Sequence, residues 1–134
     1  MINLDTGTAI AFVAEESNLR YQLQSYVKNQ SMVMTQTAIA EFRNIVQTIG
    51  GEREQQRGIN FEKYIVIIPD NPSKRALNLQ PTRKLGINDI IILGTGDNLG
   101  IVTMTGDAKA IRSASNQGVN FIVYLHQPVP LKGL

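Results

Sequence analysis

The chain begins MINLDTGTAIAFV (residues 1–13), and the short stretch LDTGT at positions 4–8 decides which fold it can have. A run of apolar residues carries one acid, Asp5, into a turn of threonine and glycine. An ionised carboxylate at the end of a buried strand needs a partner, because burying an unpaired charge is costly. What Asp5 can do therefore depends on the elements that follow it.

Strand and helix patterns alternate along the rest of the chain. Short runs of apolar and β-branched residues predict strands, buried on both faces as in a parallel sheet, at residues 2–5, 31–34, 64–68, 101–104 and 120–124. Apolar stripes with helical spacing predict helices at residues 18–28 and 37–49, the second ended by Gly50 and Gly51. Further helices are expected from about residues 73, 88 and 107. This alternation predicts an α/β fold with right-handed crossovers and a mostly parallel sheet of about five strands.

Length and composition limit the organisation of the protein. With 134 residues, 43% of them hydrophobic, the chain can bury one core, so we expect a single domain over residues 1–134 with an extended tail at 126–134. The absence of cysteine excludes disulfides and thiolate metal sites. No apolar run is long enough to span a bilayer, which predicts a cytoplasmic protein with no membrane association.

Charge is distributed unevenly. The formal net charge is +2, from 13 Lys and Arg against 11 Asp and Glu. If four acids gather in one site, 13 basic and 7 acidic residues remain elsewhere, a formal charge of +6. The segment from residue 53 to 84 holds seven of the basic residues and is either a polyanion-binding surface or an ordinary solvated one.

Four acids occupy comparable places in the predicted fold. Ligands of an open parallel sheet bind beyond the carboxyl ends of the strands. Asp5 ends the first strand, Asp107 follows the strand at 101–104, Asp89 opens a helix, and Glu41 lies one turn into the helix that begins near residue 37. We therefore expect the four carboxylates to point into one crevice.

In this order and spacing, LDTGTAIAF, MTQTAIAEF and INDIIILGTGDNLGIVTMTGD resemble the motifs of PIN-domain nucleases, in particular VapC-type toxins. The resemblance extends from residue 2 to about residue 124. It implies a three-layer α/β/α fold and the cleavage of RNA with Mg²⁺ or Mn²⁺. By position, Asp5, Glu41, Asp89 and Asp107 match the acidic quartet of the family. For this group the resemblance also implies a homodimer inhibited by an antitoxin protein.

The chemistry accounts for these residue types. Phosphodiester hydrolysis needs an activated water and a stabilised leaving oxygen, which hard divalent ions held by carboxylates can supply. We expect Asp5 and Asp89 to bind the ion directly, Asp107 to bind it directly or through water, and Glu41 to orient water or a second ion. Thr6 and Thr105 match the hydroxyl positions beside the first and last acids and would hydrogen-bond a carboxylate or a phosphate. The lone histidine, His126, is expected to be an ordinary surface residue.

Some positions depart from the family pattern. Gly94 and Gly96 should loosen the helix after Asp89, since glycine costs a helix about 1 kcal/mol relative to alanine. Gly7 replaces a larger residue, and Lys109 stands where many relatives carry a second acid or amide. A cation there favours a single metal ion or a lysine that neutralises the scissile phosphate. Arg112, one turn beyond Asp107, could do the same, although both cations also suit a solvated helix face.

Alternatives remain at this point. Asp89 and Asp107 could each be simple helix caps. A non-catalytic PIN-fold module that binds RNA or acts as a scaffold would keep the same sequence features. The Asp-Thr-Gly motif with the later run Ile91-Ile92-Leu93-Gly94 also fits a retropepsin-like aspartic protease. That enzyme is almost entirely antiparallel β structure, however, whereas here helical patterns follow Asp5.

Overall fold

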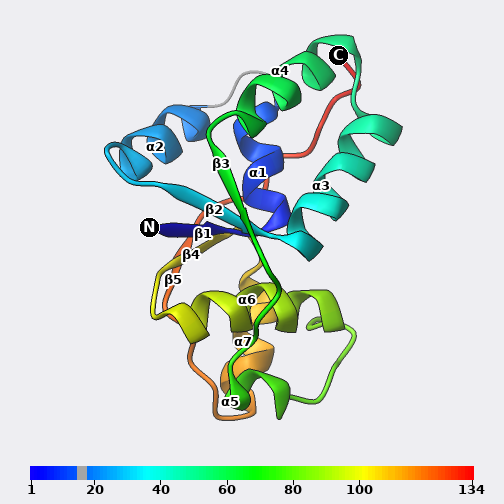
Figure 1. Ribbon diagram of the computed structural model, residues 1–134. Coiled ribbons are helices and arrows are strands. Elements are labelled where there is room, and N and C mark those ends of the chain that lie inside the picture. The colour runs from blue at the N-terminus through cyan, green and yellow to red at the C-terminus, as the bar shows by residue number, and fades with distance from the viewer. Residues whose placement is uncertain (15–17) are drawn as a thin grey trace.

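The computed structural model describes residues 1–14 and 18–134, which form an α/β fold around one sheet (Figure 1). All strand pairs are parallel, and the strand order is β3-β2-β1-β4-β5. In chain order the elements are β1 (Ile2–Leu4), α1 (Thr6–Val13), α2 (Asn18–Val27), β2 (Met32–Thr35), α3 (Gln36–Ile49), α4 (Glu52–Glu62), β3 (Ile65–Ile68), α5 (Lys74–Leu77), α6 (Ile87–Leu99), β4 (Thr103–Thr105), α7 (Ala108–Asn116) and β5 (Val123–Leu125). The predicted α/β fold with a parallel sheet of five strands is confirmed.

Helices cover both faces of the sheet. Figure 1 shows α1 to α4 on one side and α5 to α7 on the other, which gives three layers. The antiparallel β architecture that a retropepsin-like protease requires is therefore not the fold of this chain. Among the described residues, no helix combines the length and the apolarity that crossing a membrane would need.

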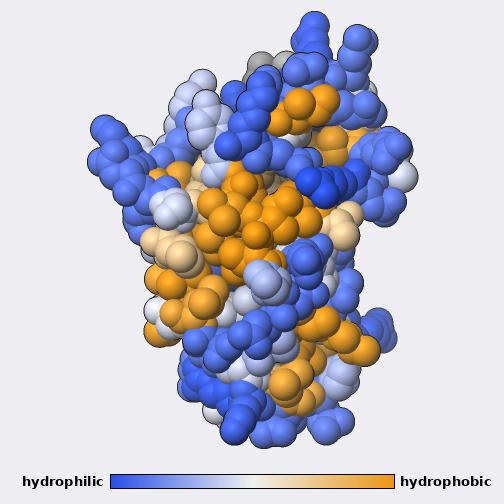
Figure 2. All heavy atoms as spheres, viewed as in Figure 1, coloured by the Kyte–Doolittle hydropathy of each residue, from blue (hydrophilic) through white to orange (hydrophobic). Residues whose placement is uncertain are grey.

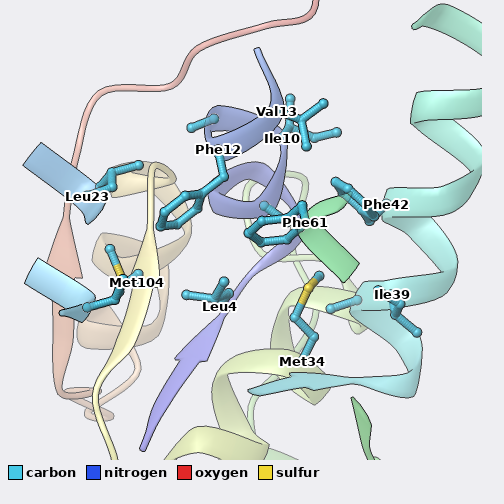
Figure 3. Close-up of a cluster of buried hydrophobic side chains, with 14 of the residues drawn as sticks. Leu4, Ile10, Phe12, Val13, Leu23, Met34, Ile39, Phe42, Phe61 and Met104 are labelled. Carbon is cyan, nitrogen blue, oxygen red and sulfur yellow. The ribbon is translucent and has the colours of Figure 1, made fainter. Parts of the chain in front are cut away.

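Each helical layer has its own hydrophobic cluster. On the α1 side, Leu4, Met34 and Met104 of the sheet pack beneath the aromatic rings of this layer (Figure 3). Phe61 stacks on Phe12 with 5.2 Å between ring centroids and tilts against Phe42 at 5.7 Å. On the other side, Leu85, Leu93 and Phe121 are among the buried residues that join α5, α6 and α7. Burial of these apolar surfaces is the main force that holds the layers on the sheet.

The register of the sheet brings the carboxyl ends of its strands to one edge. Leu4 pairs with Met104, Met34 with Ile67, and Thr105 with Leu125. Asp5 follows β1 directly and Asp107 lies two residues after β4, at the edge where an open α/β sheet binds its ligands.

Strand β3 differs from the sequence prediction. Its run Ile-Val-Ile-Ile suggested burial on both faces, but β3 is an edge strand, and the side chains of Val66 and Ile67 are 54% and 45% exposed. Strand β5, at the other edge, is also only partly buried. Figure 2 shows an apolar area over the part of this face where Figure 1 draws β3.

The two glycines of α6 are packing residues, which corrects the expectation that they loosen the helix. Helix α6 is continuous across both. A Cβ atom at Gly94 would lie 2.7 Å from the side chains of Ala76 and Pro72, and one at Gly96 would overlap the hydroxyl of Thr103. Glycine lets α6 approach α5 and β4 more closely than any side chain would allow.

Residues 126–134 form an arm without helix or strand, which runs from the end of β5 back to the start of α4. Glu54 is fully buried at its far end. Its carboxylate accepts hydrogen bonds from the backbone N–H groups of Lys132, Gly133 and Leu134, each 2.9 Å long, and of Gly51 at 3.0 Å. One carboxylate thus fixes the arm to the α3–α4 layer.

Candidate functional site

A cleft of about 650 Å³ opens at the carboxyl edge of the sheet. All eight residues singled out from the sequence line it: Asp5, Thr6, Glu41, Asp89, Thr105, Asp107, Lys109 and Arg112. They come from α1, α3, α6, α7 and the strand ends between them. The structure therefore brings these residues together, while their catalytic and metal-binding roles stay predictions.

Asp5 directly follows β1 and caps α1. Its Oδ1 accepts a hydrogen bond of 2.8 Å from the backbone N–H of Thr8, and its own N–H donates to Met104 O. Helix α1 was not predicted from the sequence, and its N-terminus is the partner that a half-buried carboxylate requires here.

Asp89 and Asp107 also cap helices. Asp89 Oδ2 accepts from the N–H of Gly86 at 2.9 Å, and Asp107 Oδ1 accepts from the N–H of Ala110 at 3.0 Å. In each case only one carboxylate oxygen makes the bond, and the other has no hydrogen-bond partner in the described part of the chain. The capping role and a ligand role therefore do not compete for the same atom.

The N-termini of three helices consequently meet at the cleft. Asp5 caps α1, Asp89 closes the first turn of α6, and Asp107 caps α7. Each helix N-terminus carries a partial positive charge. This field partly offsets the repulsion among the carboxylates and explains how the fold tolerates them side by side.

Glu41 is held by two donors. Thr6 Oγ1 donates to Glu41 Oε1 at 2.7 Å, and Asn88 Nδ2 donates to Oε2 at 3.1 Å. A carboxylate that accepts on both oxygens is fixed in orientation. The sequence indicated the hydroxyl of Thr6 but not the amide of Asn88, which becomes a neighbour of Glu41 only through the packing of α3 against α6.

The pKa values of two acids in the cleft are perturbed. Burial raises the pKa of Asp5 above its ordinary value, although hydrogen bonds from Thr105 and Thr8 and the charge of His126 act in the opposite direction. Burial also raises the pKa of Asp89, opposed by the Gly86 N–H and reinforced by the charges of Asp107, Glu41 and Asp5. The carboxylates are therefore close enough to act on one another electrostatically.

His126, expected to be an ordinary surface residue, is only partly buried after the end of β5 but contacts a residue of α1. Its Nε2 lies 2.6 Å from Thr8 Oγ1, and its Nδ1 lies 2.9 Å from Gln127 O. The Thr8 hydroxyl donates its single proton to Met104 O at 2.8 Å. The Thr8 oxygen can then accept a hydrogen bond from Nε2 in the ring tautomer that carries its proton there.

The metal-ligating atoms that the cleft offers are oxygens, which suit a hard divalent cation better than a soft metal ion. Within residues 1–14 and 18–134, no three His, Asp or Glu side chains already stand as a compact ligand group. The cleft nonetheless offers carboxylate oxygens, including those of Asp89 and Asp107 left over from capping, and no thiolate. Oxygen ligands of this kind fit Mg²⁺ or Mn²⁺ rather than zinc or copper.

Similar solved structures identify the fold. The chain resembles VapBC2 from Rickettsia felis bound to a DNA fragment from its promoter, with a TM-score of 0.66 and 16% identity over 95% of this chain and 100% of that one. It also resembles DNA-bound VapBC from Salmonella typhimurium (TM-score 0.63, 14% identity, 94% and 96% coverage) and FitAcB from Neisseria gonorrhoeae (0.64, 16%, 92% and 96%). At this level of identity the likeness defines the fold alone, which is the PIN-like three-layer α/β/α fold.

The family of the chain follows from its sequence. Residues 8–133 match the family model described as "Protein of unknown function (DUF1308)", and the chain belongs to this family.

Proposed function

We propose that the protein is a divalent-metal-dependent ribonuclease that hydrolyses phosphodiester bonds of RNA in the carboxylate cleft. One observation supports this proposal above all others: four carboxylates from separate elements line a single cleft at the carboxyl edge of a PIN-like parallel sheet. Asp5, Asp89 and Asp107 would hold Mg²⁺ or Mn²⁺. When bound, the ion would supply a water of lowered pKa and a counter-charge for the leaving oxygen.

The remaining residues of the cleft would orient the attacking water and hold the phosphate. Glu41, fixed by Thr6 and Asn88, would orient the attacking water. Thr105 would keep Asp5 and the start of α7 in place, because its hydroxyl hydrogen-bonds Asp5 and accepts from the Asp107 N–H at 3.0 Å. Lys109 and Arg112 at the rim would hold the phosphate against the carboxylates.

We further propose that the protein is the toxin of a toxin–antitoxin pair, acting on RNA in the cytoplasm as a homodimer that a partner protein inhibits. The similar structures from Rickettsia felis and Salmonella typhimurium support this proposal, since both are VapBC assemblies bound to DNA. A non-catalytic module that binds RNA or serves as a scaffold is the alternative. One observation supports this alternative: within the described residues, the carboxylates do not already form a compact ligand group for a metal ion.

Incubation with a mixed RNA pool tests the proposal. The native protein should cut RNA with Mn²⁺ or Mg²⁺ and not with EDTA. Asp5→Asn and Asp89→Asn should reduce the rate at least about 100-fold. Asp70→Asn should leave it unchanged, because Asp70 is an exposed carboxylate outside the cleft that accepts hydrogen bonds from Thr37 in the first turn of α3. Cleavage that persists in Asp5→Asn, or in EDTA, would contradict the proposal. RNA binding by the native protein without any cleavage would favour the non-catalytic module.

A further inference from the structure

A second hollow, of about 550 Å³, adjoins the carboxylate cleft. Its walls include Arg83 and Lys84 of the loop before α6, and Lys109, Arg112 and Asn116 of α7. Lys109 and Arg112 also line the carboxylate cleft, so the two hollows are neighbours that share these residues of α7. We name the second one the basic groove, because it contains four cations and no acid lines it.

The cations of the basic groove are available to a ligand. In the described part of the chain, none of Arg83, Lys84, Lys109 and Arg112 forms a side-chain hydrogen bond or an ion pair. Other cations of the protein are engaged: Arg43 pairs with Glu62 and Arg75 with Asp97, both at 2.6 Å. Four unneutralised cations in one hollow repel one another, and an anion would relieve that repulsion.

The basic residues between positions 53 and 84 do not form one surface. Of the seven basic residues between positions 53 and 84, only Arg83 and Lys84 line the groove. Arg57 donates to Val13 O on the opposite layer, and Arg75 is in its ion pair. The remaining two cations of the groove come from α7, 25 or more residues later in the chain.

The loop that carries Arg83 and Lys84 is fixed against α7. Thr82 Oγ1 accepts from the N–H groups of Lys84 and Leu85 and lies 3.0 Å from Ser113 Oγ. The backbone of Gln80 exchanges two hydrogen bonds with the side chain of Gln117, and Leu85 is completely buried. The backbone that carries the two cations is therefore held in place before any ligand arrives, which lowers the entropy cost of binding.

We infer that the basic groove binds the phosphate backbone of a single-stranded RNA on one side of the bond that the carboxylate cleft cuts. This inference rests on the proposed function. A strand that places one phosphate in the cleft has to leave it, and the basic groove is a hollow that shares Lys109 and Arg112 with the cleft. From Asp107 to Asn116, α7 rises by about 13 Å, which is enough for a few nucleotides to follow it.

An acidic peptide is the other ligand that four cations could attract. The position of the groove favours RNA over a peptide, because two of its four cations, Lys109 and Arg112, also line the cleft that contains the carboxylates. A peptide has no reason to occupy both hollows, whereas an RNA strand bound by the cations would extend to the site where its phosphodiester bond would react.

Binding in EDTA tests this inference without relying on catalysis. The anisotropy of a short single-stranded RNA with a 5′-fluorescein label would be measured with native protein, with Arg83→Gln/Lys84→Gln, and with Lys28→Gln/Lys63→Gln. The last variant loses the same charge from residues that line neither hollow. An Arg83→Lys/Lys84→Arg variant keeps the charge at the loop, and melting curves verify that each variant is folded.

The groove variant should bind at least about tenfold more weakly at low salt, and the slope of log K against log salt should become shallower by about 1.4, as two lost phosphate contacts to a single strand predict. The charge-keeping variant should bind like native protein, and the control should change much less than the groove variant. Equal losses in groove and control variants, or unchanged binding in the groove variant, would overturn the inference. So would displacement of the RNA by poly-glutamate of equal charge at equal concentration.

The two proposals fail in different ways. RNA binding that depends on Arg83 and Lys84 without any cleavage would remove the nuclease and keep the groove. Metal-dependent cleavage with unchanged RNA affinity in the groove variant would keep the nuclease and remove the groove.

Discussion

At the scale of single residues, three aspartates perform a structural task in the place where a chemical one is proposed. Asp5, Asp89 and Asp107 each give one oxygen to a helix N-terminus. The sequence left open whether Asp89 and Asp107 are caps or ligands, and the structure shows that capping leaves an oxygen of each available. The same aspartate can therefore cap a helix with one oxygen and offer the other to a metal ion.

Glu54 is the opposite case, a buried acid whose partners are all backbone. Burial acts to raise the pKa of Glu54, but the hydrogen bonds from Gly51, Lys132, Leu134 and Gly133 outweigh it and lower the pKa below its ordinary value of 4.5. No local pattern indicates this role, since three of the four donors lie 78 to 80 positions away in the sequence.

Glu54→Gln should lower the free energy of unfolding by about 2 to 3 kcal/mol at neutral pH, because an amide NH₂ group would face N–H donors that have no other acceptor. The folded pKa is lowered, so the contribution of Glu54 is present above pH 4.5 and is lost as the pH falls below that value. Urea denaturation of both proteins across this range measures the difference. Glu52→Gln, an exposed acid of the same helix, serves as control, and equal losses in the two variants would contradict the assigned role.

At the scale of elements, the sequence predicted those whose apolar period is visible. Helix α3 shows a clear stripe with Ile39, Phe42 and Val46 buried, and it was expected within one residue of its bounds. Helix α1 was missed because its residues Thr8–Val13 are all buried, which leaves no polar face to define a period. Helix α4 was missed for the converse reason, since it buries only Glu54, Gly58 and Phe61.

The burial of β3 was misjudged for a related reason. Apolar residues at successive positions predict a strand, but they do not tell whether a further strand or helix covers it. That information is in the strand order, which places β3 at an edge. Helix α6 also shows that local sequence does not report tertiary packing, because helix propensity alone predicts that Gly94 and Gly96 destabilise the helix.

Gly96→Ala should destabilise the protein by about 2 to 3 kcal/mol, whereas helix propensity alone would predict a gain of about 1 kcal/mol. The added Cβ would overlap Thr103 Oγ1 and approach Asn3 Nδ2 to 3.0 Å, and both residues are buried. Thermal and urea denaturation measure the change. Gly7→Ala in α1 is the matched control, because its Cβ would meet only Asp5 Oδ1 at 3.8 Å and the substitution should be neutral or stabilising. A stabilised Gly96→Ala protein would show that α6 can move away from β4.

At the scale of the whole molecule, one rule connected sequence and site. Acids at the carboxyl ends of parallel strands meet at one edge, and from this rule the gathering of Asp5, Glu41, Asp89 and Asp107 could be predicted. The neighbours contributed by folding could not be predicted. His126 enters through the arm after β5, and the basic groove needs the loop before α6 to lie against α7, neither of which leaves a local pattern.

The cleft should make the folded protein less stable at neutral pH than it would be without its charges. The raised pKa values of Asp5 and Asp89 mean that the folded state holds these protons more tightly than the unfolded one. Stability is therefore lost as the pH rises through the interval between the ordinary value of 3.8 and the raised values. In metal-free buffer at pH 7, Asp5→Asn should then be more stable than native protein by about 1 kcal/mol, and asparagine can still cap α1.

Mn²⁺ should reverse this order. It would raise the melting temperature of native protein by a few degrees, more strongly as the carboxylates lose their protons with rising pH, and it would have little effect on Asp5→Asn. Melting curves of both proteins with Mn²⁺ or with EDTA, at matched ionic strength and at several pH values, provide the measurement. Equal shifts in the two proteins would place the ion elsewhere.

The contact between Glu54 and residues 132–134 also has a consequence for biosynthesis. A ribosome delivers Glu54 long before it delivers the three amides that surround its carboxylate. Until they emerge, the nascent chain must leave this acid in water, so the layer formed by α3 and α4 cannot reach its final packing. This part of the fold therefore cannot be completed until residues 132–134 have been synthesised, and a nascent chain that stops before residue 132 should remain open to proteases around α4.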